Sequence, residues 1–333
     1  MQRSAIVRVS RAIFASMMLL LAGNVAAQGW KPSGTVEIII PAGPGGGADR
    51  SGRFLQTLMR DQKLVGTPVM VSNRAGAGGV IASNYLLQHN GSGEHLLIGS
   101  PTLLTTPTEA TGKVSPLEFT PIARLYTEYL MVAVKADSDI RTGRDFVERL
   151  RKDPQALSIT VGVGLGNVNH IGVALPLRRA GVDITALRVV TYKSISEATT
   201  AVLGGHVDVV SATPAVLLPH VASGRLRVIA LAAPDRMTGV FANVPTWKEL
   251  GWDATVAFYH SVVGPRGMRP EQVAYWNDVI ARAVATDAWK EMLKKLYLEE
   301  GYLGSADMRR YMEEQHRELN AMLSAMKLNS PPN

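Results

Sequence analysis

The sequence predicts an α/β protein whose strands are joined by crossover helices. From Thr35 onward, short apolar or β-branched runs alternate with longer segments of helical period, an alternation typical of parallel sheets. From Pro270 to about Met326 the pattern is almost wholly helical. Strands are expected at residues 36–40, 68–71, 96–98, 130–134, 158–161, 187–191, 207–210, 227–231 and 254–263.

Helix boundaries are marked by capping pairs and glycines. A Ser or Thr followed three residues later by an acid predicts a helix start, because the two side chains satisfy amides of the first turn. Glycines favour the left-handed residue that closes a helix, and Pro176 predicts a kink or an early end. The expected starts are Thr142 with Asp145, Ser194 with Glu197 and Thr246 with Glu249, and the expected ends are Gly204, Gly205 and Gly224.

Residues 1–27 have the pattern of a secretory signal peptide. Three arginines without an acid precede the apolar run Ala12 to Ala22, and Val25-Ala26-Ala27 offers small residues for cleavage. A spanning helix needs about 20 apolar residues, so this run is too short. We therefore expect a soluble mature protein in the periplasm. An uncleaved anchor or a lipoprotein is the alternative, but there is no cysteine to acylate.

Length and composition limit the function further. The chain has 333 residues, and the mature part of about 306 suits two domains of ordinary size. The absence of cysteine excludes disulfides and thiolate metal sites, and we expect neither a metal nor a cofactor. The formal charge of +7 includes three leader arginines. The remaining mild basic balance suits an anionic ligand and does not indicate nucleic acid.

A glycine-rich loop follows the first predicted strand and leads into a helical pattern. Glycines let a backbone approach a ligand closely, and the first amides of a helix favour an anion. The loop runs from Pro41 to Asp49, and we interpret Asp49 as the cap of the helix. It fits neither a Walker loop nor a dinucleotide-binding fingerprint. The candidate donors are Gly45, Gly46, Gly47 and Ala48.

A second loop repeats this arrangement after the strand at 68–71. Carboxyl ends of parallel strands are where ligands bind in open sheets, so the two loops are expected to offer several amides to one carboxylate. Arg74 adds a charge there or serves as a structural clamp. The candidate donors are Gly76, Ala77, Gly78 and Gly79.

A third loop lies in the second half of the chain and again opens a helix. Gly166, Asn167 and Asn169 bring neutral donors and acceptors suited to a carboxylate or hydroxyl that must be released. His170 is either a ligand contact or a buried histidine with one satisfied nitrogen. Four further candidates follow predicted strands, namely Ser100, Thr102, Tyr192 and Lys193.

These motifs in this order resemble the periplasmic solute receptors of tripartite tricarboxylate transporters, also called the Bordetella uptake gene family. The likeness runs from about Trp30 to the C-terminal helices. Its markers are Ile40-Pro41, Pro44-Gly45-Gly46 with Asp49, Asn73-Arg74, the Gly76 to Gly79 loop, the Gly164 to His170 loop, Tyr192-Lys193, Leu203-Gly204-Gly205 with Val207-Asp208, Leu218-Pro219-His220 with Gly224, and Val244-Pro245-Thr246.

The resemblance implies a two-lobed periplasmic binding protein, type II-like, in which each lobe is a mainly parallel sheet flanked by helices. Residues 28–130 and 255–333 would form one lobe and residues 131–254 the other. The lobes would close around a small organic acid, which passes to integral-membrane permease subunits, and the receptor would be a monomer. The family commonly places an aromatic residue where this chain has Ala42, so the resemblance does not fix the pocket wall or the size of the ligand.

Three alternatives remain beside uptake. The carboxylate receptor is equally suited to serve a sensor. An exported hydrolase is disfavoured, because there is no Gly-x-Ser-x-Gly elbow, no His-Glu-x-x-His and no paired acids in an apolar setting. His206, Asp208 and His260 are interpreted as structural or solvated. A phosphate or nucleotide binder is also possible, since glycine loops at helix starts suit phosphate as well as carboxylate.

Overall fold

The computed structural model describes residues 29–105, 115–162 and 164–328. The predicted signal peptide at 1–27 lies outside the described residues. All elements below belong to the compact unit formed by Pro32–Asn333.

The first of two sheets has six strands in the order β11-β4-β10-β3-β1-β2. Strand β1 is parallel to β2 and β3, whereas β10 runs antiparallel to β3 and β4, and β11 antiparallel to β4. The sheet is therefore mixed. Its strands are β1 (Val36–Ile40), β2 (Val69–Asn73), β3 (His95–Gly99), β4 (Thr120–Tyr129), β10 (Ala257–Gly264) and β11 (Glu299–Gly304).

The second sheet has five strands in the order β7-β6-β8-β5-β9. Strand β6 is parallel to β7 and β8, and β5 is antiparallel to β8 and β9. Only Leu130 separates β4 of the first sheet from β5 of the second. The strands are β5 (Met131–Lys135), β6 (Ser158–Thr160), β7 (Arg188–Val190), β8 (Val209–Ala212) and β9 (Leu226–Leu231).

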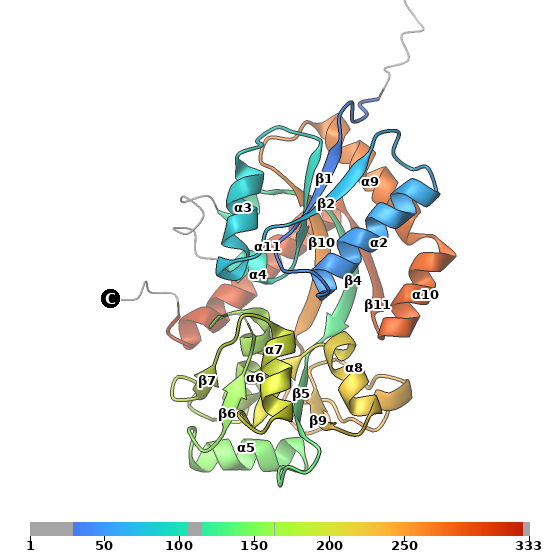
Figure 1. The fold of residues 1–333 in the computed structure, drawn as a ribbon. Helices are drawn as coiled ribbons and strands as arrows, with labels where there is room; N and C mark the ends of the chain where they lie inside the picture. The colour runs from blue at the N-terminus through green and yellow to red at the C-terminus, as the bar shows by residue number, and fades with distance from the viewer. Residues whose placement is uncertain (1–28, 106–114, 163, 329–333) are drawn as a thin grey trace, which may run out of the picture. The chain divides into compact units, whose positions relative to one another are not determined.

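Helices flank both sheets (Figure 1). The first sheet contacts α2 (Gly47–Asp61), α3 (Val80–Leu87), α9 (Pro270–Val284), α10 (Asp287–Leu296) and α11 (Ser305–Ala325). The second contacts α6 (Val168–Arg179), α7 (Ile195–Leu203) and α8 (Pro214–Ala222). The remaining helices are α4 (Thr102–Thr105), α5 (Gly143–Lys152), and the 3₁₀ turns η2 (Ala77–Gly79), η4 (Pro116–Glu118) and η5 (Gly239–Phe241).

The predicted two-part α/β architecture is confirmed, with mixed rather than mainly parallel sheets. Every predicted strand is present within a few residues of its expected place. Two strands were not predicted, β4 and β11. The expectation of an almost wholly helical chain from Pro270 was therefore wrong over Glu299–Gly304, which pairs with β4 at the sheet edge.

The predicted helix boundaries hold with two exceptions. Thr142 and Ser194 cap their helices through their side chains, and Gly205 and Gly224 adopt positive φ. Thr246 and Glu249 exchange the expected hydrogen bonds, but they close a turn instead of starting a helix. Helix α6 continues for three residues beyond Pro176, so the early end was wrong.

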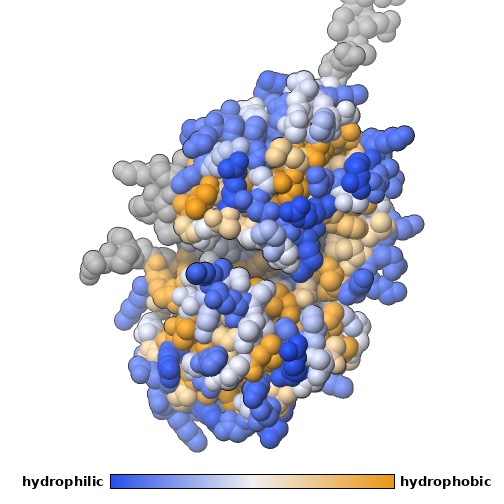
Figure 2. All heavy atoms as spheres, viewed as in Figure 1, coloured by the Kyte–Doolittle hydropathy of each residue, from blue (hydrophilic) through white to orange (hydrophobic). Residues whose placement is uncertain are grey.

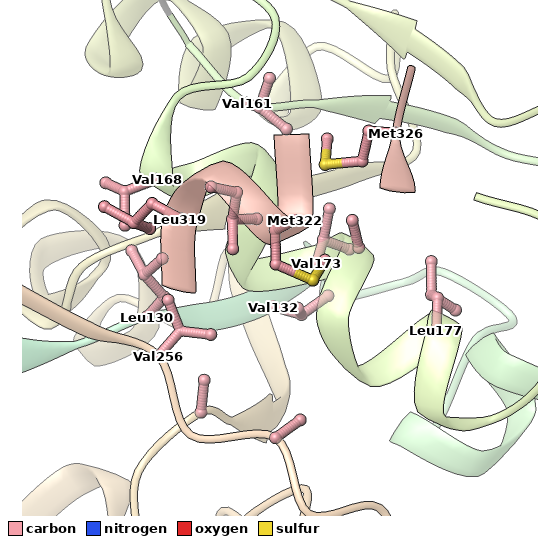
Figure 3. Close-up of a cluster of buried hydrophobic side chains, with 14 of the residues drawn as sticks. Leu130, Val132, Val161, Val168, Val173, Leu177, Val256, Leu319, Met322 and Met326 are labelled. Atoms are coloured by element: carbon pink, nitrogen blue, oxygen red, sulfur yellow. The ribbon is translucent and has the colours of Figure 1, made fainter. Parts of the chain in front are cut away.

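The C-terminal helix α11 packs its apolar side chains against α6 of the second sheet as well as β4 of the first. Figure 3 shows Leu319, Met322 and Met326 of this part of the chain among Val168 and Val173 of α6. One hydrophobic cluster thus includes residues from both sheets, and burying apolar surface is the main favourable term in folding.

Truncating a side chain in this cluster should destabilise the whole unit. We expect Met322→Ala to lower the free energy of unfolding by about 2 to 3 kcal/mol, because it removes buried methylene groups and leaves a cavity. Met70→Ala is the control, since Met70 is 46% exposed. Urea denaturation checks both variants, and equal losses would contradict the packing role of Met322.

Candidate functional site

The first glycine loop leads from β1 directly into α2 and leaves the start of that helix without a cap. Gly46 is the N-cap residue and provides no side-chain hydrogen bond. The amides of the first turn, Gly47, Ala48 and Asp49, have no partner within the helix, as in every α-helix. Together with the helix dipole they form a site suited to an anion.

Asp49 organises this loop from inside the first turn. Its carboxylate accepts from the amide of Gly45 at 2.9 Å and from Nε of Arg53 at 3.0 Å. The predicted helix cap is thus corrected: Gly46 occupies the cap position, and Asp49 binds the loop. The Gly45 amide is consequently engaged within the protein. Burial alone would raise the pKa of Asp49, but hydrogen bonds from Arg53, Gly45 and Asn73 outweigh it and lower the pKa.

The second loop lies beside the first. The side-chain nitrogen of Asn73 donates to the carbonyl of Ala42 and to Asp49, both at 2.9 Å. A Cβ on Gly79 would lie 3.5 Å from Cβ of Pro41 in the first loop. The structure therefore brings together the two predicted loops.

The backbone of the second loop is left-handed over four successive residues. Their φ angles are 135° at Gly76, 46° at Ala77, 63° at Gly78 and 97° at Gly79. Glycine adopts such angles without the steric cost that a Cβ brings. Gly79 is the N-cap of α3 and makes no side-chain cap hydrogen bond. The second loop is thus a second uncapped helix start.

Arg74 serves as the structural clamp beside this loop. Its guanidinium lies 3.2 Å from the ring centre of Tyr85, and one nitrogen is 3.3 Å from Glu37. Burial raises the pKa of Glu37, while hydrogen bonds from Ser72, Tyr85 and Arg74 more than compensate and lower it.

The third loop differs, because its polar side chains have partners within the protein. Asn167 accepts from the amide of His170 and donates to the carbonyl of Val161, both at 2.9 Å. Asn169 donates to the carbonyl of Ser211 at 2.9 Å. Gly166 donates to Nδ1 of His170 at 3.1 Å. The start of α6 is therefore capped by its own residues.

His170 matches the structural interpretation. Nδ1 is satisfied by Gly166, whereas Nε2 is buried without a partner among the described residues. Burial lowers the pKa of His170 to about 4. The neighbouring Gly166 has a φ of 78°, and a Cβ there would lie 2.8 Å from Leu323 of α11.

The remaining predicted binding residues lie at the ends of β3 and β7. Ser100 follows β3, Thr102 is the first residue of α4 and Tyr192 follows β7, and all three are half-buried. Lys193 is exposed, and its amide donates to Glu197 at 3.1 Å. In the described part of the chain, the side chains of Ser100, Tyr192 and Lys193 form no hydrogen bond with the glycine loops.

A buried polar cluster behind the first loop was not predicted. Ser51 lies 2.8 Å from the hydroxyl of Tyr126, and that hydroxyl also makes a short hydrogen bond to Nδ1 of His260. A Cβ on Gly47 would lie 3.0 Å from Cε1 of His260. Burial lowers the pKa of His260 to about 3, so this imidazole is neutral. His260 belongs to β10, as expected, and supports the loop from below.

Glu128 is a further buried residue of this region that the sequence did not indicate. It lies on β4 and is 3% exposed. With Gly47 and Arg50 of α2 and Ala215 of α8 it lines a small cavity. Its only sequence signal is an acid in the stretch from Leu125 to Tyr129, which directly precedes the strand predicted at 130–134 and was not itself predicted as a strand.

Within the described ranges, no group of three or more His, Asp or Glu side chains is arranged to hold a metal ion. None of the helices placed in the structure is both long and apolar enough to cross a membrane.

Comparisons with known proteins converge on one group. The family model described as "Tripartite tricarboxylate transporter family receptor" matches residues 53–328. The UPF0065 protein in the gbd 5' region of Cupriavidus necator is 27% identical and covers 98% of each chain. Protein BugT of Bordetella pertussis is 28% identical, over 77% of this chain and 78% of BugT.

Solved structures share the fold. A protein of R. palustris solved with adipate has a TM-score of 0.79 at 22% identity, covering 89% of this chain and 98% of that one. MatC from Rhodopseudomonas palustris with bound malate has a TM-score of 0.76 at 22% identity, covering 88% and 99%.

The internal hydrogen bonds of Asn167 predict a structural contribution that can be measured without a ligand. Asn167→Ala should lower the free energy of unfolding by about 1 to 2 kcal/mol, because it removes the cap of α6 and a buried donor. Asn167→Ser retains a capping oxygen and should lose less. Chemical denaturation decides the point, and an unchanged stability in Asn167→Ala would exclude the cap.

Proposed function

The chain belongs to the family of tripartite tricarboxylate transporter receptors, which are periplasmic solute-binding proteins, and we propose on this premise that it captures a small organic acid through a carboxylate. The acid then passes to the integral-membrane permease subunits of a tripartite tricarboxylate-type transporter. Malate and adipate in the two R. palustris structures support a carboxylate ligand.

The observation that carries this proposal is the pair of uncapped helix starts held side by side. Gly46 and Gly79 both provide no capping side chain, and Asn73 ties the two loops together. A carboxylate has two oxygens, each able to accept more than one hydrogen bond. The proposed donors are the amides from Gly46 to Ala48 and from Gly76 to Gly78, because the Gly79 amide already donates to the carbonyl of Gly76 at 3.0 Å.

We propose the lobe boundaries predicted above. Strands β1 to β4, β10 and β11 form one sheet and β5 to β9 the other, which supports crossings near residues 130 and 255. Closure about these crossings would cover the bound acid and strengthen its charge-assisted hydrogen bonds. On this proposal Asn169, Tyr192 and Lys193 approach from the second lobe.

Export by the signal peptide, a monomeric state and the absence of catalysis are part of the same proposal. The His260 and Tyr126 pair is buried beneath Gly47, with each side chain under 5% exposed. Such a pair supports the loop and is not placed to meet a substrate. A sensory role for the same receptor would use the same binding site.

A thermal-shift screen of the mature protein tests the ligand class. We expect malate, adipate and citrate to raise Tm, because a ligand that binds only the folded state stabilises it. Inorganic phosphate and nucleotides serve as the comparison. Stabilisation by the phosphates alone would overturn the carboxylate proposal.

A valine in the first loop should abolish binding without disturbing the fold. Gly46 has a φ of −75°, and a Cβ there would meet only the Gly43 carbonyl, at 3.9 Å. Gly46→Val therefore fits the backbone but fills the space in front of the amides. Gly34→Val is the matched control, since a Cβ at Gly34 meets nothing within 4 Å.

Isothermal titration calorimetry compares the affinities of wild type, Gly46→Val and Gly34→Val for the organic acid that raises Tm most in the thermal-shift screen. We expect roughly a hundredfold or greater loss for Gly46→Val, the equivalent of about two charge-assisted hydrogen bonds. Wild-type affinity in this variant would rule out the first loop as the binding site.

A further inference from the structure

Glu128 occupies an unusual position in the fold. It is the second-last residue of β4, three residues before β5 of the other sheet begins at Met131. The cavity beside it measures about 10 Å³, which is room for about one water molecule. Gly47 and Arg50 line the cavity from the first sheet's side and Ala215 from α8 on the second.

The carboxyl group is incompletely satisfied. Its Oε2 is buried and has no hydrogen-bond partner among the described residues. Thr213, the N-cap residue of α8, hydrogen-bonds the Glu128 side chain. An ionised carboxylate that is desolvated and only partly paired is costly, whereas a neutral carboxyl group is not.

The groups that face Glu128 do not offset the cost of burying its ionised carboxylate. From α2, the exposed Arg50 directs Nη1 to the carbonyl of Gly45 at 3.0 Å. From β4, the buried Tyr126 has its pKa raised, and from β10 His260 is neutral. The other elements contribute apolar side chains, Met292 and Leu296 of α10, and Leu298.

Together these effects place the pKa of Glu128 near neutral pH. Burial raises the pKa of Glu128 to about 7, although the Thr213 hydrogen bond and the charge of Arg50 oppose the rise. Glu128 is therefore placed between the two sheets in a condition where small changes of solvent access alter its charge.

We propose that Glu128 is a proton-binding site that regulates carboxylate capture, because the neutral side chain favours the arrangement in which α8 covers it and the ionised side chain opposes it. The inference rests on the proposed function. Gly47 lines the same cavity and is a proposed donor to the ligand, so an ionised Glu128 would also repel the bound anion. The contact with α8 and the repulsion of the bound anion both favour a protonated Glu128 in the ligand-bound state. Binding of the carboxylate is therefore accompanied by uptake of a proton, and the affinity falls as pH rises.

The proton site itself is tested without a ligand. A carboxyl group whose pKa is raised on folding makes the folded state bind more protons than the unfolded state between the ordinary pKa of 4.5 and about 7. The contribution of Glu128 to the free energy of unfolding is therefore fully present below pH 4.5 and is lost as pH rises to about 7. Glu128→Gln cannot ionise, so its Tm advantage over wild type should grow between pH 5 and pH 8.

Glu148→Gln on the exposed surface of α5 is the control and should show no such growth. Small-angle X-ray scattering of the ligand-free proteins adds a test of the lobe contact. The radius of gyration of wild type should increase between pH 6 and pH 8.5, while Glu128→Gln keeps the smaller value. A Tm difference independent of pH, or the same scattering response in both proteins, would overturn the proposal.

Calorimetry with malate and adipate tests the link to capture. Wild-type Kd should rise roughly fivefold between pH 6.5 and pH 8.5, within the limit of about tenfold per pH unit that one proton allows, and Glu128→Gln should bind with a constant Kd. Equal pH dependence in both proteins would refute the link while leaving the receptor function intact. A Glu128-dependent scattering response without binding of any carboxylate would instead refute the proposed ligand class alone.

Discussion

The Asp49 carboxylate is the contact on which the candidate site depends. It is 3% exposed, and a buried carboxylate is tolerated only when donors surround it. Its donors come from the first loop, from α2 and from Asn73 at the end of β2. One charged group thus fixes both glycine loops relative to each other. Because the Asp49 carboxylate already has its hydrogen-bond donors, it holds the two loops in place, and the remaining loop amides keep their orientation.

The helix starts at the predicted binding loops are capped differently, although this is not a rule for either sheet, since Thr286 caps α10 and Thr213 forms no cap hydrogen bond at α8. Next to the five-stranded sheet, Asn167 and Ser194 cap α6 and α7 with their own side chains. Next to the six-stranded sheet, Gly46 and Gly79 provide none. Amides left without a side-chain partner are those available to a ligand. Figure 2 shows hydrophobic residues in scattered patches among hydrophilic ones on the face that it displays.

Sequence patterns identified the elements whose signal is local. Val36–Ile40 is apolar except for Glu37 and forms β1 at its predicted residues, and the glycine loops follow their strands as expected. Strand β4 escaped prediction because it is buried on both faces and carries Arg124 and Glu128, so it shows no alternation. Its charges are accommodated only by tertiary contacts, such as the Tyr311 ring 4.5 Å from the Arg124 guanidinium.

Other parts of the site depended equally on contacts that no local pattern reveals. The residues of β11 include two acids and two glycines, and pairing with β4 alone makes them a strand. The sequence placed Asn167 and Asn169 in a loop that opens a helix, which is correct, but their hydrogen bonds to Val161 and Ser211 arise from the fold. The position of Glu128 beside α8 likewise exists only once both sheets have formed.

The packing of α11 has a consequence for how the chain matures. Leu319 and Met322 lie about 150 residues, in sequence, beyond their α6 neighbours Val168 and Val173, a separation on the scale that slows folding. The second sheet's core remains incomplete until the end of the polypeptide arrives.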